Sequence, residues 1–127
     1  MTEKKVLIPG PHHPISIVPC PSRVVVKFGG EVIADTKEAL LLHQPTTPMR
    51  YLIPQKDIKM NLMERSEKMT YCPYKGDVSY FSIKSGDASS ANAAFCYEAP
   101  YDAVAAMKDR LGFYPEKVEL IVEEKTS

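Results

Sequence analysis

The twelve residues Thr-Tyr-Cys-Pro-Tyr-Lys-Gly-Asp-Val-Ser-Tyr-Phe, positions 70–81, organise the expected fold of this chain. Residues 72–77 have the composition of a turn, because proline fixes its own φ and glycine lets the chain reverse. Residues 79–84 then have the composition of a strand. We therefore expect a turn that leads directly into a strand, with sheet before it and with a partner strand and a covering helix after it.

The same stretch brings together a thiol, a primary amine, an acid and three phenols. Pro73 restrains the preceding Cys72 to an extended conformation, and Gly76 would let Lys75 lean back towards the thiol. On the strand that follows, Tyr80 would lie on the face opposite Phe81 and Ile83. We predict that Cys72, Lys75 and Tyr80 line one cavity.

Each of these residues also has a purely structural interpretation. Cys72 is either a nucleophilic or redox-sensitive thiol beside an ammonium group, or a small buried apolar residue at the end of a strand. Residues 75–77, Lys-Gly-Asp, either contact a phosphate or carboxylate, or form a turn in which Asp77 caps its own backbone. The sequence leaves both alternatives open.

The clearest local signal is a hairpin over residues 23–35. Gly29-Gly30 separates two β-branched runs, and both central positions of a two-residue hairpin turn need positive φ. The register that follows pairs Phe28 with Glu31 and Val26 with Ile33. The expected buried face contains Val24, Val26, Phe28 and Ile33.

Further elements follow from apolar patterns and from the punctuation of eleven prolines. Short strands are expected at residues 39–43, 50–53, 58–63, 92–98 and 117–122. A helix is expected to begin at Pro100 and to end at Gly112. We predict a mainly β protein of about eight short, mostly antiparallel strands, with a proline-rich N-terminal arm (1–22) packed on one β-rich domain (23–124) and a frayed tail over 123–127.

The composition excludes several classes of protein. Among 127 residues, 16 lysines and arginines balance 16 acids, so no basic surface for nucleic acid is expected. No apolar run is long enough to cross a membrane, and the apolar part of the N-terminus is too short for a signal peptide. Three cysteines without a pairing pattern are typical of reduced thiols, and we expect a cytoplasmic protein.

No metal site or cofactor is expected. Cys20, His43, Cys72 and Cys96 stand singly, without the Cys-x-x-Cys spacing of structural zinc sites. His12 and the adjacent His13 cannot both point at one ion from a strand. The purified protein should therefore contain no stoichiometric zinc.

Two functional hypotheses remain. In the first, the protein binds a small anionic molecule and could act on it: Lys75 and Arg50 would hold the anion, Cys72 would be the reactive atom, and Tyr80 could pass a proton. The other candidate ligand-binding residues are Asp57, Tyr74, Asn92 and His13. In the second, the protein is a non-catalytic binding or assembly module whose tyrosines form a homodimer surface.

Several motifs together resemble a known bacterial family, the domain of unknown function 427, over nearly the whole chain. They are Phe28-Gly29-Gly30 with Ala34-Asp35; Tyr51, Pro54 and Asp57; Cys72-Pro73-Tyr74-Lys75-Gly76; Asn92-Ala93-Ala94; and Gly112-Phe113-Tyr114. One departure is Phe95, where relatives often carry tryptophan.

The resemblance implies a β-tent-like architecture, in which two antiparallel sheets lean together. Some members of that wider fold hold zinc on paired cysteines, which this chain lacks. The family also carries the label nucleotidyltransferase-like. No acid pair or glycine signature in this sequence supports that activity.

Overall fold

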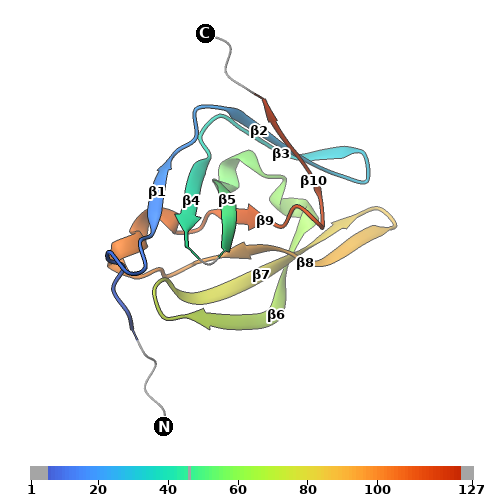
Figure 1. The fold of residues 1–127 in the computed structure, drawn as a ribbon. Helices are drawn as coiled ribbons and strands as arrows, with labels where there is room; N and C mark the ends of the chain where they lie inside the picture. The colour runs from blue at the N-terminus through green and yellow to red at the C-terminus, as the bar shows by residue number, and fades with distance from the viewer. Residues whose placement is uncertain (1–5, 46, 124–127) are drawn as a thin grey trace.

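The computed structural model describes residues 6–45 and 47–123, and within them ten strands form two antiparallel sheets (Figure 1). The larger sheet has the order β1 (Ser16–Pro19), β4 (Leu40–Gln44), β5 (Thr47–Ile53), β9 (Leu111–Phe113), β8 (Ala88–Cys96), β7 (Gly76–Ser85) and β6 (Met63–Cys72). The smaller sheet has the order β10 (Glu119–Glu123), β2 (Arg23–Phe28) and β3 (Glu31–Thr36). The prediction of a mainly β fold in one small domain is confirmed.

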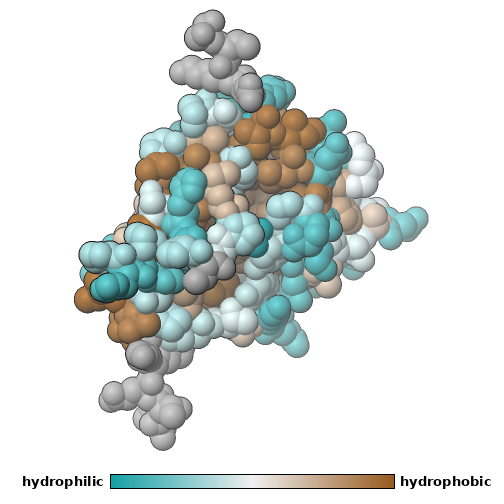
Figure 2. Space-filling model, viewed as in Figure 1, coloured by the Kyte–Doolittle hydropathy of each residue, from teal (hydrophilic) through white to brown (hydrophobic). Residues whose placement is uncertain are grey.

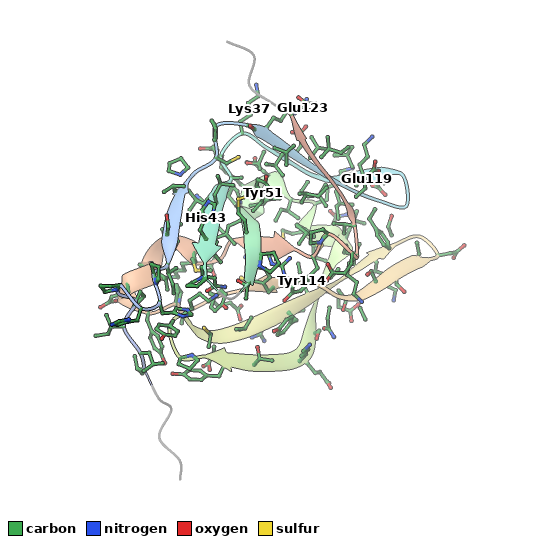
Figure 3. The ribbon with its side chains drawn as sticks, in the orientation of Figure 1. Lys37, His43, Tyr51, Tyr114, Glu119 and Glu123 are labelled. Atoms are coloured by element: carbon green, nitrogen blue, oxygen red, sulfur yellow. The ribbon has the colours of Figure 1, made fainter. Side chains whose placement is uncertain are left out.

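The seven-stranded sheet buries side chains on both of its faces. Because successive strand residues point to opposite sides, Phe81 and Ile83 pack in one cluster while Val78 and Tyr80 pack in another. The first cluster lies between the two sheets and includes residues of β2 and β3. The second lies on the opposite face, against β1 and a short helix. Tyr51 packs against the first cluster and Tyr114 against the second (Figure 3).

The hairpin over β2 and β3 is confirmed, with φ of 59° at Gly29 and 84° at Gly30. Phe28 pairs with Glu31 as expected, but Val26 pairs with Ala34 instead of Ile33 because a β-bulge shifts the register. The bulge lets two consecutive residues, Ile33 and Ala34, enter the core, at 0% and 2% exposed. The predicted buried face is otherwise correct, except that Phe28 is only half-buried.

The C-terminal helix is shorter than predicted and has a different geometry. It is a 3-10 helix, η3 (Asp102–Met107), with non-helical angles at Val104 (φ −129°). Only Val104 and Met107 of this segment are buried, so packing does not support a longer amphipathic helix. Gly112 does not end the helix. It lies in β9 opposite Phe95, whose ring would be 2.3 Å from a Cβ atom at Gly112.

The prediction of a strand at residues 58–63 is wrong. Two 3-10 turns, η1 (Gln55–Asp57) and η2 (Met60–Leu62), occupy this region, and β6 begins only at Met63. The edge strand β6 was missed because its side chains are mostly exposed and carry little apolar alternation. Glu123 belongs to β10 and not to a frayed tail, whereas 124–127 lie outside the described residues. Of the helices described, none is long and apolar enough to cross a membrane.

Candidate functional site

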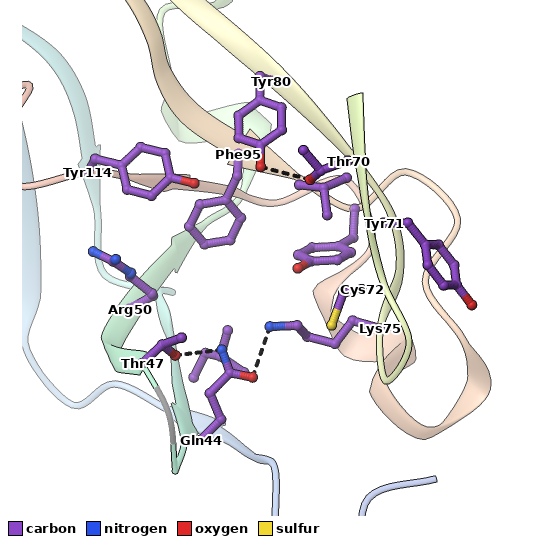
Figure 4. Close-up of a pocket in the computed structure, with 13 residues that line it drawn as sticks. Gln44, Thr47, Arg50, Thr70, Tyr71, Cys72, Lys75, Tyr80, Phe95 and Tyr114 are labelled. Carbon is purple, nitrogen blue, oxygen red and sulfur yellow. Dashed lines mark hydrogen bonds between the residues drawn. The ribbon is translucent and has the colours of Figure 1, made fainter. Parts of the chain in front are cut away.

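A cavity of about 210 Å³ lies where the β4–β5 turn faces the β6–β7 turn (Figure 4). Several of its lining residues, among them Leu42, Val78 and Phe95, belong to the second core cluster, and polar side chains line the rest. Its volume is below the range of about 300–1,000 Å³ that drug-sized ligands occupy, which suits a small molecule. The lining residues are Leu42, Gln44, Thr47, Arg50, Thr70, Tyr71, Cys72, Lys75, Val78, Tyr80, Phe95, Tyr97 and Tyr114.

The β6–β7 turn is held by its own backbone and by a neighbouring segment. The N–H of Lys75 donates to the carbonyl of Cys72 (3.2 Å), and the carbonyl of Lys75 accepts from the N–H of Tyr101 (3.1 Å). Gly76 has a φ of 111°, and a Cβ there would lie 3.3 Å from the carbonyl oxygen of Ala99. This close packing fixes the turn so that Cys72 and Lys75 both face the cavity.

Lys75 is the central polar residue of the cavity, and it is only 5% exposed. Its Nζ donates to Oε1 of Gln44 (2.9 Å), and the Gln44 amide in turn donates to the Thr47 hydroxyl (2.6 Å). Burial lowers the pKa of Lys75; the Cys72 thiol acts in the opposite direction, and the Arg50 charge lowers it further. Among the lining residues that the structure describes, there is no carboxylate to pair with the ammonium group.

Phenols and a guanidinium supply further polar atoms. The hydroxyl groups of Tyr80 and Thr70 are 2.8 Å apart and share a hydrogen bond. Burial raises the pKa of Tyr114 to about 12, and a hydrogen bond with Tyr80 adds to this effect, so Tyr114 stays protonated near neutral pH. The Arg50 guanidinium lies 5.1 Å from the centroid of the Tyr114 ring. Tyr114 and Lys75 both line the cavity, and in Figure 4 the Phe95 ring is drawn between the Tyr114 hydroxyl and the Lys75 amine.

The structure brings together four of the residues singled out from the sequence. Cys72, Lys75, Tyr80 and Arg50 all line the cavity, although they come from the β6–β7 turn, β7 and β5. Cys72 is half-buried, and the structure describes all three cysteines as free thiols. The geometric expectation that the thiol, the amine and the phenol share one cavity is met.

Tyr74 and His13 do not line the cavity. Their rings stack on each other, with centroids 4.0 Å apart, and the N–H of Leu7 donates to the carbonyl of Pro73 (2.9 Å). The N-terminal segment therefore lies against the β6–β7 turn, while the interior of the cavity is formed by the strands.

Asp57 and Asn92 also lie elsewhere. Asp57, in η1, accepts a hydrogen bond from Thr36 (2.7 Å) and lines other surface hollows. Asn92 lies in β8 with a φ of 51°, and its N–H donates to the Ser82 hydroxyl (3.0 Å). The Asn92 side-chain oxygen is buried without a hydrogen-bond partner among the described atoms.

Gln44, Thr47 and Thr70 also line the cavity, and the sequence does not predict them there. The first two lie in another hairpin, and only the pairing of β4 with β5 and the curvature of the sheet place them opposite Lys75. No local pattern distinguishes them from ordinary turn residues. In the described ranges, no group of three or more His, Cys, Asp or Glu side chains could hold a metal ion.

Comparison with known proteins identifies one family. The model of the family described as a domain of unknown function (DUF427) matches residues 16–124. This range contains all ten described strands and leaves out only the two ends of the chain. No curated protein matches the chain. Because the match covers most of the 127 residues, the chain belongs to the DUF427 family.

Proposed function

We propose that this protein binds a small molecule through an anionic group held by Lys75 and Arg50. The observation that carries the proposal is the environment of the Lys75 amine, which is buried in a cavity with a neutral amide as its hydrogen-bond acceptor. A buried ammonium without a counter-charge is costly, and lysine is seldom fully buried unless it is paired. An anionic ligand would supply the missing charge.

The neighbouring charges support the same assignment. Arg50 is half-buried on β5, and its charge acts against the protonated form of Lys75. An anion between Lys75 and Arg50 would relieve their repulsion.

The remaining lining residues would serve any chemistry on the bound molecule. Cys72 is the candidate nucleophile, since it is partly accessible and lies close enough to Lys75 to affect its pKa. Tyr80 is the candidate proton carrier, through its hydrogen bond to Thr70. The cavity offers none of the carboxylates that hold metal ions in nucleotidyl transfer, among the lining residues described.

Calorimetric titration with sodium L-lactate and, separately, with inorganic phosphate at low ionic strength tests the proposal. We expect at least one anion to bind. Lys75→Met and Arg50→Met should each weaken binding by about tenfold, because each variant removes one charged hydrogen-bond donor to the anion. Lys84→Met is the matched control, because Lys84 is exposed on β7 and should not affect binding. Binding of only one anion would identify the ligand group as carboxylate or phosphate. Failure of both anions to bind, or equal loss in the control, would refute the proposal.

The alternative, a homodimer surface formed by tyrosines, has less support. It requires tyrosines exposed on a flat patch, but none of the seven tyrosines is exposed. On the face shown in Figure 2, hydrophobic residues gather over β2, β3 and β10, which contain no tyrosine. Analytical ultracentrifugation would test the homodimer separately.

A further inference from the structure

The Lys75 amine combines two features that anion binding alone does not use. It projects into a cavity that a small molecule could fill, and its surroundings disfavour its charged form. We propose that Lys75 forms a Schiff base with a short 2-oxo acid whose carboxylate is held by Arg50. This inference rests on the proposed function, because it assigns the anionic group to a carboxylate and gives the bound molecule an adjacent carbonyl.

The surroundings of Lys75 match those that activate lysine as a nucleophile. Such lysines are desolvated in an apolar pocket or lie beside another cation. Lys75 has both conditions: it is 5% exposed, and Arg50 lines the same cavity. Burial and the Arg50 charge both lower its pKa. No described lining residue carries a carboxylate that would reverse the effect.

The hydrogen bond to Gln44 leaves the amine free to react. The Gln44 oxygen accepts one N–H of Lys75 at 2.9 Å, and the Gln44 amide is fixed in turn by Thr47. A neutral amine can donate this hydrogen bond and still keep its lone pair available. Gln44 therefore acts as a positioning residue that orients Nζ within the cavity.

A 2-oxo acid matches the separation of roles in the cavity. Its carboxylate and its carbonyl carbon are adjacent, so a guanidinium that binds the first presents the second to an amine across a small space. Arg50 and Lys75 lie on opposite sides of the cavity in Figure 4, with the Arg50 guanidinium on the side of Tyr114. The volume of about 210 Å³ favours a short acid, such as pyruvate, over a long one.

The phenols complete the reaction. The lone pair of Nζ forms the C–N bond, and the carbonyl π electrons move to the oxygen, which takes a proton from Tyr114. One N–H proton returns to the Tyr114 phenolate, which gives the neutral carbinolamine. Its hydroxyl takes a second proton from Tyr114 and leaves as water: the C–O bond breaks, the nitrogen lone pair forms the C=N bond, and the second N–H proton returns to the phenolate. The net change is amine plus ketone to imine plus water, with no oxidant or reductant. Tyr114 is the candidate donor because it lines the cavity as a protonated phenol and Tyr80 is its hydrogen-bond partner.

Reductive trapping tests the inference. Wild-type protein would be incubated with pyruvate and sodium cyanoborohydride, and the adduct would be located by intact mass and peptide mapping. We expect one reduced pyruvate on Lys75, formed about tenfold or more faster than on the exposed Lys84. L-lactate, which has the carboxylate but no carbonyl, should slow the trapping by competition. Lys75→Met should remove the fast adduct and Lys84→Met should not.

The outcomes separate this inference from the proposed function. If L-lactate binds but pyruvate leaves no fast adduct, the Schiff base is refuted and the anion site stands. If phosphate alone binds and no adduct forms, the Schiff base is refuted and the anion site stands. If neither L-lactate nor phosphate binds and no adduct forms, both are refuted. Adducts spread evenly over exposed lysines would also refute the Schiff base. The competition by L-lactate uses only wild-type protein, so the test does not depend on the folding of a variant.

Discussion

Replacing Lys75 by methionine should leave the folded protein at least as stable as the wild type near neutral pH. The surroundings of Lys75 suit a ligand-binding residue, because the described lining residues lack the carboxylate partner that a structural buried lysine would have. Lys75 is 5% exposed, and the hydrogen-bond acceptor of its amine is the neutral Gln44 amide. A buried lysine held by a carboxylate would behave in the opposite way, because its loss would leave an uncompensated charge.

The expected magnitude follows from two opposing effects. The variant loses the hydrogen bond from Lys75 to Gln44, which contributes about 1.5–3 kcal/mol when the donor is charged. It also avoids the desolvation of the ammonium, which costs several kcal/mol. Gln44 keeps its hydrogen bond to Thr47. We therefore expect the free energy of unfolding to change by between zero and a gain of about 2 kcal/mol.

The pH dependence provides a second readout with a defined sign. The pKa of Lys75 is lowered in the fold from its unfolded value of 10.5. Between the lowered pKa and 10.5 the unfolded state binds more protons than the folded state, so wild-type stability rises with pH in this window. This contribution is complete above 10.5 and is lost as the pH falls through the lowered pKa. The advantage of the methionine variant should therefore be largest at neutral pH and should shrink towards pH 10.5.

Urea unfolding of wild type, Lys75→Met and Lys84→Met over this pH range measures both effects. The Lys84 variant should remain within about 0.5 kcal/mol of wild type, since it removes an exposed side chain without a structural partner. A loss of about 3–5 kcal/mol in Lys75→Met would equal the cost of breaking a buried ion pair and would refute the reasoning.

Three further predictions concern the framework and the thiols. Gly112→Ala should lower the free energy of unfolding by about 1–3 kcal/mol, because its Cβ would lie 2.3 Å from the Phe95 ring; an unchanged urea midpoint would contradict this packing. Gly30→Val should cost about 1–2 kcal/mol through its positive φ, whereas Gly10→Val, which has open space and no positive φ, should be tolerated; equal melting curves for the two would contradict it. Iodoacetamide should alkylate Cys72 faster than Cys20 or Cys96, since Cys20 is buried and burial of Cys96 raises its pKa to about 12. The Lys75→Met variant should lose much of this advantage, and equal labelling of the three thiols by mass spectrometry would contradict the prediction.

The parts of the fold that could be predicted from the sequence have strong local causes. Gly29-Gly30 predicts its hairpin because few other residues accept positive φ at both turn positions. The alternation of Tyr80 and Phe81 placed them correctly on opposite faces, in different core clusters. The turn between Cys72 and Gly76 followed from proline and glycine, and it positions the thiol and the amine together.

The parts that could not be predicted depend on distant contacts. Gly112 was interpreted as the end of a helix, but its lack of a side chain accommodates Phe95 from the neighbouring strand. The pattern after Pro100 predicts an α-helix, but the structure has a 3-10 helix there, because only Val104 and Met107 are buried. Gln44 enters the site only through the pairing of β4 with β5 and the curvature of the larger sheet. Neither the strand pairing nor the sheet curvature can be predicted from the residues next to Gln44.

The central claim, an anion site between Lys75 and Arg50, is tested most directly by locating an anion in crystals. Crystals grown in sodium bromide and measured at the bromine absorption edge would show bound bromide as anomalous peaks. We predict a peak within hydrogen-bonding distance of the Lys75 Nζ, on the side that faces Arg50, and we predict its absence in Lys75→Met crystals. Bromide bound elsewhere on the surface while this cavity stays without a peak, or a carboxylate of the chain seated on Lys75, would contradict the account.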